Sequence, residues 1–128
     1  MRKYGLLRLA LIALFATLTF GSFAQTLLGQ KIDIKDFHVV KNQNKVEINW
    51  SVDKKASTNY FEVEKSNDGK IFKTVAYVLG ADPSKTNCEC YGCFDKINIR
   101  SKESYYRLKH VDTNGQIQFS EVKMIALK

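Results

Sequence analysis

The feature that most constrains this chain is an alternation of apolar and polar residues that recurs in short segments. The clearest segment is VEINWSV, whose apolar residues share one phase: Val46, Ile48, Trp50 and Val52. A two-residue period over seven residues predicts a strand with one buried face. Helical spacing is absent from residue 25 onward, so an all-β domain is expected.

Turn signals separate further segments of this kind. NYFEVEKSNDGKIFKTVAYVLG predicts a hairpin, with a turn at residues 66–69 and a returning strand over residues 71–79. Asn114-Gly115 is the strongest short-range hairpin signal. The apolar residues after it change phase, which predicts a bulge near Ser120 and Glu121. KIDIKDFHVV offers a first strand, and its own phase slips between Ile34 and Phe37, as a bulge or bend would cause.

The segments add up to about seven short strands. Without a helix, this pattern is typical of a sandwich of two antiparallel sheets. We expect Trp50 between the two sheets. The predicted core consists of Val46, Ile48, Trp50, Phe61, Val63, Tyr106 and Leu108.

The first 24 residues predict export. Arg2, Lys3 and Arg8 form a basic region, an uncharged apolar stretch covers residues 9–20, and small residues favour cleavage between Ala24 and Gln25. The stretch is shorter than the roughly 20 residues of a membrane span. The expected organisation is a signal peptide (1–24), a lead-in with the first strand (25–35) and a sandwich domain (36–128), with no membrane span in the mature chain.

Export changes the charge and the redox environment of the chain. Cleavage leaves 104 of 128 residues and lowers the formal net charge from +7 to +4, because the removed residues carry three basic and no acidic side chains. Such a small excess does not indicate nucleic-acid binding. The expected location is the periplasm, the cell surface or the medium, where thiols tend to pair.

Three segments resemble one known family. VEINWSV, NYFEVEKSNDGKIF and SYYRLKHVDTNGQIQFSEV are similar to the fibronectin type III or immunoglobulin-like β-sandwich module of exported Bacteroidetes-type proteins. That module often precedes a type IX secretion sorting domain. The resemblance covers residues 36–127 and implies fold and export, and no catalytic residue comes with it. We expect two departures from the family pattern: no sorting domain after the module, and Cys93 at a usually aromatic core position.

All three cysteines lie within CECYGC at residues 88–93. We predict a Cys90–Cys93 disulfide, because Gly92 permits a turn between them, with Cys88 left free. The alternatives are an intermolecular bond, three reduced thiols, or a metal site. Cys88, Cys90 and Cys93 would suit Cu(I), or zinc with a fourth ligand.

Other candidates for chemistry have simpler interpretations. His38 and His110 lie on different predicted strands, so both are expected to be surface or half-buried residues. Acidic residues such as Glu62 and Glu64 alternate with apolar ones, which predicts a solvated sheet face. By phase, a carbohydrate platform could use Tyr60, Tyr77, Tyr91 and Tyr105.

These observations predict a non-catalytic secreted or cell-surface module for adhesion, assembly or ligand binding. Its partner would be another protein or a surface glycan, and no cofactor is expected. The alternative is a periplasmic thiol or metal-handling protein that uses Cys88, Cys90 and Cys93. An enzyme is the weakest hypothesis because no nucleophile–base pair is evident, and the oligomeric state stays open.

Overall fold

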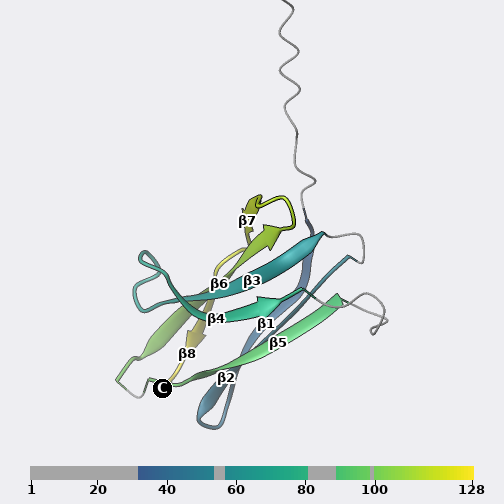
Figure 1. Cartoon of the computed structure of the whole chain (residues 1–128). Coiled ribbons are helices and arrows are strands. Elements are labelled where there is room, and N and C mark those ends of the chain that lie inside the picture. The colour runs from purple at the N-terminus through teal and green to yellow at the C-terminus, as the bar shows by residue number, and fades with distance from the viewer. Residues whose placement is uncertain (1–31, 54–56, 81–88, 99) are drawn as a thin grey trace, which may run out of the picture.

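The computed structural model describes residues 32–53, 57–80, 89–98 and 100–128, which form eight β-strands in two antiparallel sheets (Figure 1). The fold is therefore all-β, as predicted. A search of the described residues for a helix long and apolar enough to cross a membrane finds none. The expected signal peptide and its Ala24–Gln25 cleavage site lie outside the described residues.

The smaller sheet has three strands in the order β1-β2-β5. They are β1 (Ile34–Asn42), β2 (Lys45–Val52) and β5 (Glu89–Lys96). The register of β1 against β2 shifts between Lys35 and His38, where Asp36 has a φ of 52°. This bulge confirms the predicted phase slip. After it, β1 pairs with β2 again as far as Asn42, so β1 runs across the domain boundary expected at residue 35.

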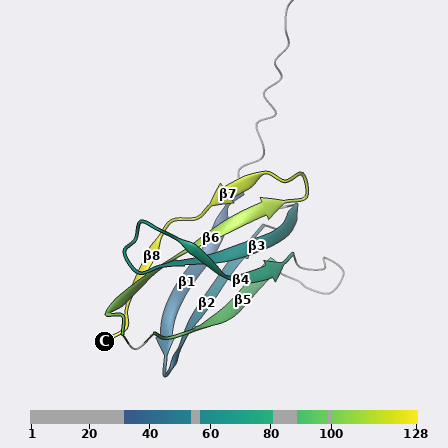
Figure 2. The ribbon, with the colours of Figure 1, turned by 60° about the vertical axis from the view of Figure 1, so that its left-hand side comes forward.

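The larger sheet contains five strands in the order β4-β3-β6-β7, with β8 also pairing with β6. They are β3 (Thr58–Ser66), β4 (Lys73–Leu79), β6 (Glu103–Asp112), β7 (Ile117–Phe119) and β8 (Lys123–Ala126). The two sheets lie face to face, and Figure 2 shows strands of one crossing those of the other.

The turn between β3 and β4 confirms the predicted hairpin, although β4 begins two residues later than expected. Gly69 takes a φ of 72°, a region that glycine enters without steric cost. The Asp68 carboxylate accepts hydrogen bonds from the backbone N–H groups of Ile71 at 2.9 Å and Lys70 at 2.8 Å. These bonds, with the Ser66 hydroxyl, lower the pKa of Asp68 to about 2.

The C-terminal apolar segment is divided by one extra residue. Lys109 pairs with Phe119 and Tyr106 with Lys123, so three steps along β6 match four steps along the partner segment. At the junction, Ser120 donates its N–H to the Leu108 carbonyl at 2.9 Å and accepts the Leu108 N–H on its Oγ at 2.8 Å. The predicted bulge is confirmed, and it splits the segment into β7 and β8.

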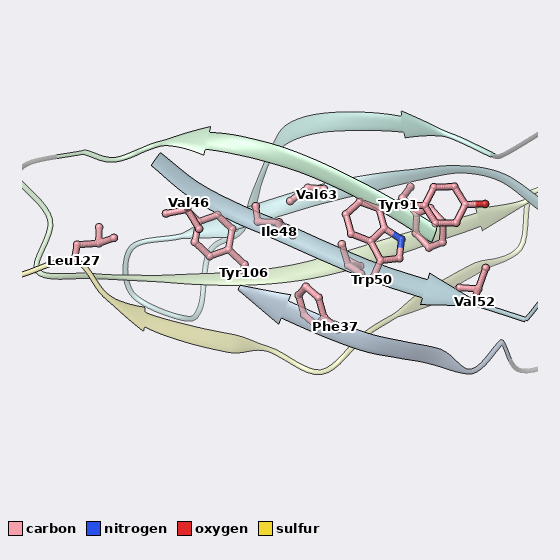
Figure 3. Packing of buried hydrophobic residues seen from close by; sticks show 11 residues of the cluster. Phe37, Val46, Ile48, Trp50, Val52, Val63, Tyr91, Tyr106 and Leu127 are labelled. Carbon is pink, nitrogen blue, oxygen red and sulfur yellow. The ribbon is translucent and has the colours of Figure 1, made fainter. Parts of the chain in front are cut away.

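The core lies between the sheets, and all seven residues expected there are buried. Trp50 is 2% exposed, and its ring centroid lies 5.2 Å from that of Phe61 in the facing sheet. Figure 3 shows Tyr91 beside Trp50 and Tyr106 beside Val46. Burying side chains of this size contributes about 1.5–3 kcal/mol each, so this layer accounts for much of the stability.

A polar contact also joins the two sheets at one edge of the core. Asp95 on β5 accepts hydrogen bonds from Lys65 Nζ on β3 at 2.6 Å and from Tyr106 Oη on β6 at 2.8 Å. Desolvation, followed by the bond to Asp95, raises the pKa of Tyr106, so its hydroxyl stays a donor. Lys65 therefore bridges the two sheets.

Candidate binding face

Strand pairing arranges the outward side chains of the larger sheet in rows that run across β4, β3, β6 and β7. We call this surface the outer face. The first row is Leu79, Tyr60, Val111 and Ile117, and the second is Tyr77, Glu62, Lys109 and Phe119. The third row is Thr74, Glu64 and Arg107. Residues between the rows, such as Phe61 and Leu108, point into the core.

Apolar side chains are concentrated on this sheet. Among the described residues ten large hydrophobic side chains are exposed, and eight of them lie on the larger sheet or the links to its strands. The eight are Ile71, Val75, Tyr77, Leu79, Ile117, Phe119, Val122 and Met124. Leu79, at 76%, is the most exposed of them. Four of them, Tyr77, Leu79, Ile117 and Phe119, stand at the ends of the first two rows of the outer face, and apolar side chains that share a face mark an interaction surface more often than scattered single residues do.

The charges in the second row are neutralised within the sheet. Glu62 accepts hydrogen bonds from Lys109 Nζ at 2.8 Å and from Thr74 Oγ1 at 2.7 Å. The bond to Lys109, followed by that to Thr74, lowers the pKa of Glu62, and the same contact raises the pKa of Lys109. Both groups therefore stay charged and paired at neutral pH.

The third row holds an arginine between two aromatic rings. Arg107 Nε donates to Glu64 Oε2 at 2.6 Å, and its guanidinium carbon lies 4.1 Å from the Phe72 ring centroid and 4.4 Å from that of Phe119. A guanidinium stacked on an aromatic face gains a cation–π attraction. The turn anchored by Asp68 supplies Phe72, which links hairpin geometry to this site.

These pairs contradict the expected solvated face. Glu62 and Glu64 are only 7% and 8% exposed, because the paired basic side chains and neighbouring rings cover them. The sequence contained a signal for this pairing. Glu62 and Glu64 are spaced by two residues on one strand, and the bases Arg107 and Lys109 have the same spacing on another. In an antiparallel register such sets can pair directly.

The four tyrosines proposed as a carbohydrate platform do not share one surface. Tyr60 and Tyr77 lie together on the outer face with ring centroids 6.1 Å apart, and Tyr105 follows on the same face beside Gly69. Tyr91 does not belong with them. It is buried and stacked 5.7 Å from Trp50, because its phase on β5 points it between the sheets.

The predicted Cys90–Cys93 disulfide is wrong. Cys93 is a free thiol, whereas Cys90 is not. The reason is that β5 pairs with β2 in unbroken register, without a turn at Gly92. Residues three apart on a straight strand lie about 10 Å apart and point to opposite faces. At Gly92 the Asn49 side chain of β2 instead lies close to the β5 backbone, since a Cβ on residue 92 would be 2.6 Å from Asn49 Oδ1.

The Cys93 thiol is half-buried against the core. Desolvation, followed by the nearby Asp95 carboxylate, raises its pKa to about 11. Such a thiol is a poor nucleophile and a poor metal ligand, since both roles need the thiolate. Cys88 lies outside the described residues. Within the residues that are described, no group of three His, Cys, Asp or Glu side chains could hold a metal ion.

The two histidines lie in different sheets. His38 is exposed on β1, as expected, but His110 on β6 is completely buried. The His110 Nε2 atom lies 3.0 Å from Thr58 Oγ1, and its ring packs edge-on to Phe61 at 5.0 Å. Desolvation lowers the pKa of His110, so the neutral ring is a packed core residue.

A pocket of about 230 Å³ opens at the end of the sandwich near the C-terminus. Its lining residues are Lys41, Gln43, Asn44, Ile97, Ser101, Leu127 and Lys128. Lys41 Nζ already donates a hydrogen bond to the Leu127 carbonyl at 2.7 Å. The lining contains no acid–base pair, so the outer face is the better-developed candidate site.

Comparisons with known proteins agree with the fold. No family model matches the sequence, and neither does any curated protein. Pectate lyase Pel3 from Pectobacterium carotovorum has a similar structure with a TM-score of 0.59, 18% identity and 74% of this chain covered. A β-1,2-glucanase from Parabacteroides distasonis gives a TM-score of 0.55 at 17% identity over 76% of this chain.

A third similar structure is pectate lyase PelI from Erwinia chrysanthemi in complex with tetragalacturonic acid, with a TM-score of 0.51, 11% identity and 72% of this chain covered. The chain spans 27% of each pectate lyase and 13% of the glucanase. At such identities the likeness is one of fold, and fold alone does not define function.

Proposed function

We propose that this chain is a non-catalytic, exported β-sandwich module of the fibronectin type III or immunoglobulin-like kind. It acts in adhesion, assembly or ligand binding at the cell surface, in the periplasm or in the medium. The observation that carries the proposal is the outer face, where exposed apolar side chains surround charges that are already paired. The partner is a protein or a surface glycan.

The energetics of the outer face support binding. Covering an isolated charge costs several kcal/mol, but Glu62 and Glu64 are already largely removed from water and hydrogen-bonded to Lys109 and Arg107. A partner that covers the face therefore gains apolar burial with little further desolvation of charge. Aromatic residues and arginine are also the residue types enriched in protein interfaces.

The similar structures add a reason to test glycans. They are enzymes named for acting on polysaccharides, and this chain matches about a quarter of each pectate lyase. A match of that size fits a domain attached to a longer enzyme. The exposed Tyr77 and its neighbour Tyr60 offer ring faces on which a sugar could stack.

The test is capture from the envelope of the producing cell. Immobilised protein should retain a component that free protein competes off, and the substitution Leu79→Glu on the outer face should reduce retention at least about tenfold. Val40→Glu is the matched control, because Val40 is 54% exposed on the other sheet. Recovery of no specific component, further copies of the chain included, would contradict the proposal.

A competing hypothesis, thiol or metal handling by Cys88, Cys90 and Cys93, rests on the clustering of the cysteines. The half-buried Cys93 thiol weakens it, because its thiolate is disfavoured. Metal analysis of protein purified under reducing conditions separates the two hypotheses. Stoichiometric copper or zinc would favour the metal site, and its absence would remove it.

A further inference from the structure

The outer face has a symmetry that indicates its partner. Across the sheet, the second row reads aromatic, acid, base, aromatic: Tyr77, Glu62, Lys109 and Phe119. The first row is apolar from edge to edge, with Leu79 on β4 and Ile117 on β7 at its ends. The second row thus matches its own reverse in polarity, with opposite charges at its centre, and the first row is apolar in either direction.

We propose that the partner is a second copy of this chain, held outer face to outer face by a two-fold axis that runs parallel to the strands between β3 and β6. Such an axis reverses each row on the opposite copy. Leu79 then lies over Ile117, Tyr77 over Phe119, and Glu62 over Lys109. The inference rests on the proposed binding role of the outer face and names its occupant.

Charge complementarity favours this axis over the alternative two-fold. An axis perpendicular to the strands would keep β3 over β3 and β6 over β6, so acids would face acids across the interface. The parallel axis instead sets the Glu62–Lys109 ion pair of one copy antiparallel to that of the other, so that each acid lies nearest the opposing base. Opposite charges set register and exclude like-charge arrangements, and an isologous two-fold interface is the commonest form of dimer.

The size of the face is sufficient for a weak, specific dimer. With strands about 4.8 Å apart and about 3.3 Å per residue, four strand positions and the nine residues of β3 cover roughly 600 Å² per copy. The pair would bury roughly 1,200 Å², at the lower end of specific interfaces. When two sheets pack face to face in this way, their strand directions differ by about 30° or less and the sheets lie about 10 Å apart, as inside a sandwich.

Sedimentation velocity on protein purified after export, from about 5 to about 500 µM, measures the association directly. The weight-average mass should approach twice that of one chain, and the dimer should persist in about 1 M salt because the apolar rows drive it. Leu79→Glu and Ile117→Lys should each weaken association about tenfold or more. Val40→Glu, on the smaller sheet, should leave it unchanged.

Mixing the two disruptive variants tests the axis. In a mixed dimer the carboxylate introduced at position 79 opposes the ammonium introduced at position 117, and the second symmetry-related contact keeps its native Leu79 and Ile117. Mixing should therefore restore association to near the wild-type level. Absence of this rescue would overturn the parallel axis, since the perpendicular axis never brings positions 79 and 117 together.

The outcomes separate this inference from the proposed function. Wild-type protein that stays monomeric up to about 500 µM overturns the dimer. If that monomer still captures an envelope component through Leu79, the proposed binding role stands without the dimer. If it captures nothing, both proposals fail.

Discussion

Cys93 shows at the scale of one residue how burial controls reactivity. Its thiol belongs to a cluster of three cysteines in sequence, yet it packs against the core and not against Cys90. The core position explains why a free thiol is tolerated in a chain expected to be exported: the thiol is shielded from oxidants by desolvation and by its neighbours.

We predict that the thiol of Cys93 is slow to react in the folded protein. Raising the pKa from 9.0 to about 11 lowers the thiolate population at pH 8 about 100-fold. Alkylation by iodoacetamide at pH 8 should therefore be at least about 100-fold slower in the native protein than in denaturant. Equal rates measured by mass spectrometry would show that the thiol is exposed.

His110 is expected to make stability depend on pH. Burial lowers its pKa in the folded state below the ordinary value of about 6.5, so the unfolded state takes up the proton first as the pH falls. The stabilising contribution of the neutral ring is complete above about pH 6.5 and is lost as the pH falls from there toward the folded pKa.

Urea denaturation between pH 8 and pH 5 measures this effect. The free energy of unfolding should decrease through that window in the wild type and stay flatter in His110→Gln, which cannot titrate. His38→Gln is the control, because His38 is exposed. An unchanged slope in His110→Gln would assign the pH dependence to another group.

At the scale of the strand pair, Glu64 and Arg107 act together with two aromatic rings. Removing the arginine leaves a carboxylate that is 8% exposed without its partner, which is costly, while partial exposure of Arg107 reduces the effect below that of a fully buried pair. The rings of Phe72 and Phe119 add contacts that a lysine would not reproduce.

We expect Arg107→Met to lower the free energy of unfolding by about 2 kcal/mol and Arg107→Lys by about 1 kcal/mol. The double variant Arg107→Met/Glu64→Gln should recover part of the loss, because it removes the unpaired charge. A double-mutant cycle from urea denaturation gives the coupling. Additive single effects would mean that the pair does not interact.

At the scale of the whole molecule, Asp95 ties the two sheets together. It accepts hydrogen bonds from both Lys65 and Tyr106, on strands of the facing sheet. The Lys65 and Asp95 side chains are 14% and 18% exposed. Loss of the carboxylate would leave a lysine and a phenolic hydroxyl without their acceptor near the core.

Asp95→Ala should therefore destabilise the protein by about 2–3 kcal/mol without changing the slope of urea denaturation. Asp53→Ala is the matched control. It removes an ion pair with Lys35 in which the Asp53 and Lys35 side chains are 66% and 47% exposed, so it should leave the free energy of unfolding nearly unchanged. Equal losses in the two variants would show that the contact between sheets adds nothing.

Local pattern was sufficient for most of the strands, for the inward face of β2 and for the hairpin between β3 and β4. The period of VEINWSV placed Val46, Ile48 and Trp50 in the core, since alternation sends every second side chain to the same side. The phase changes also located the bulges of β1 and of the C-terminal segment. These properties depend on neighbours within a few residues.

The tertiary structure alone decided which side chains from distant parts of the chain meet each strand. Glu62 and Lys109 are 47 residues apart, and their register turns an expected solvated face into a buried pair. The unbroken pairing of β5 with β2 keeps Cys90 and Cys93 on opposite faces. Sequence alone determines the phase of each strand, whereas register and sheet order determine which side chains meet, because those contacts form only when distant strands pair.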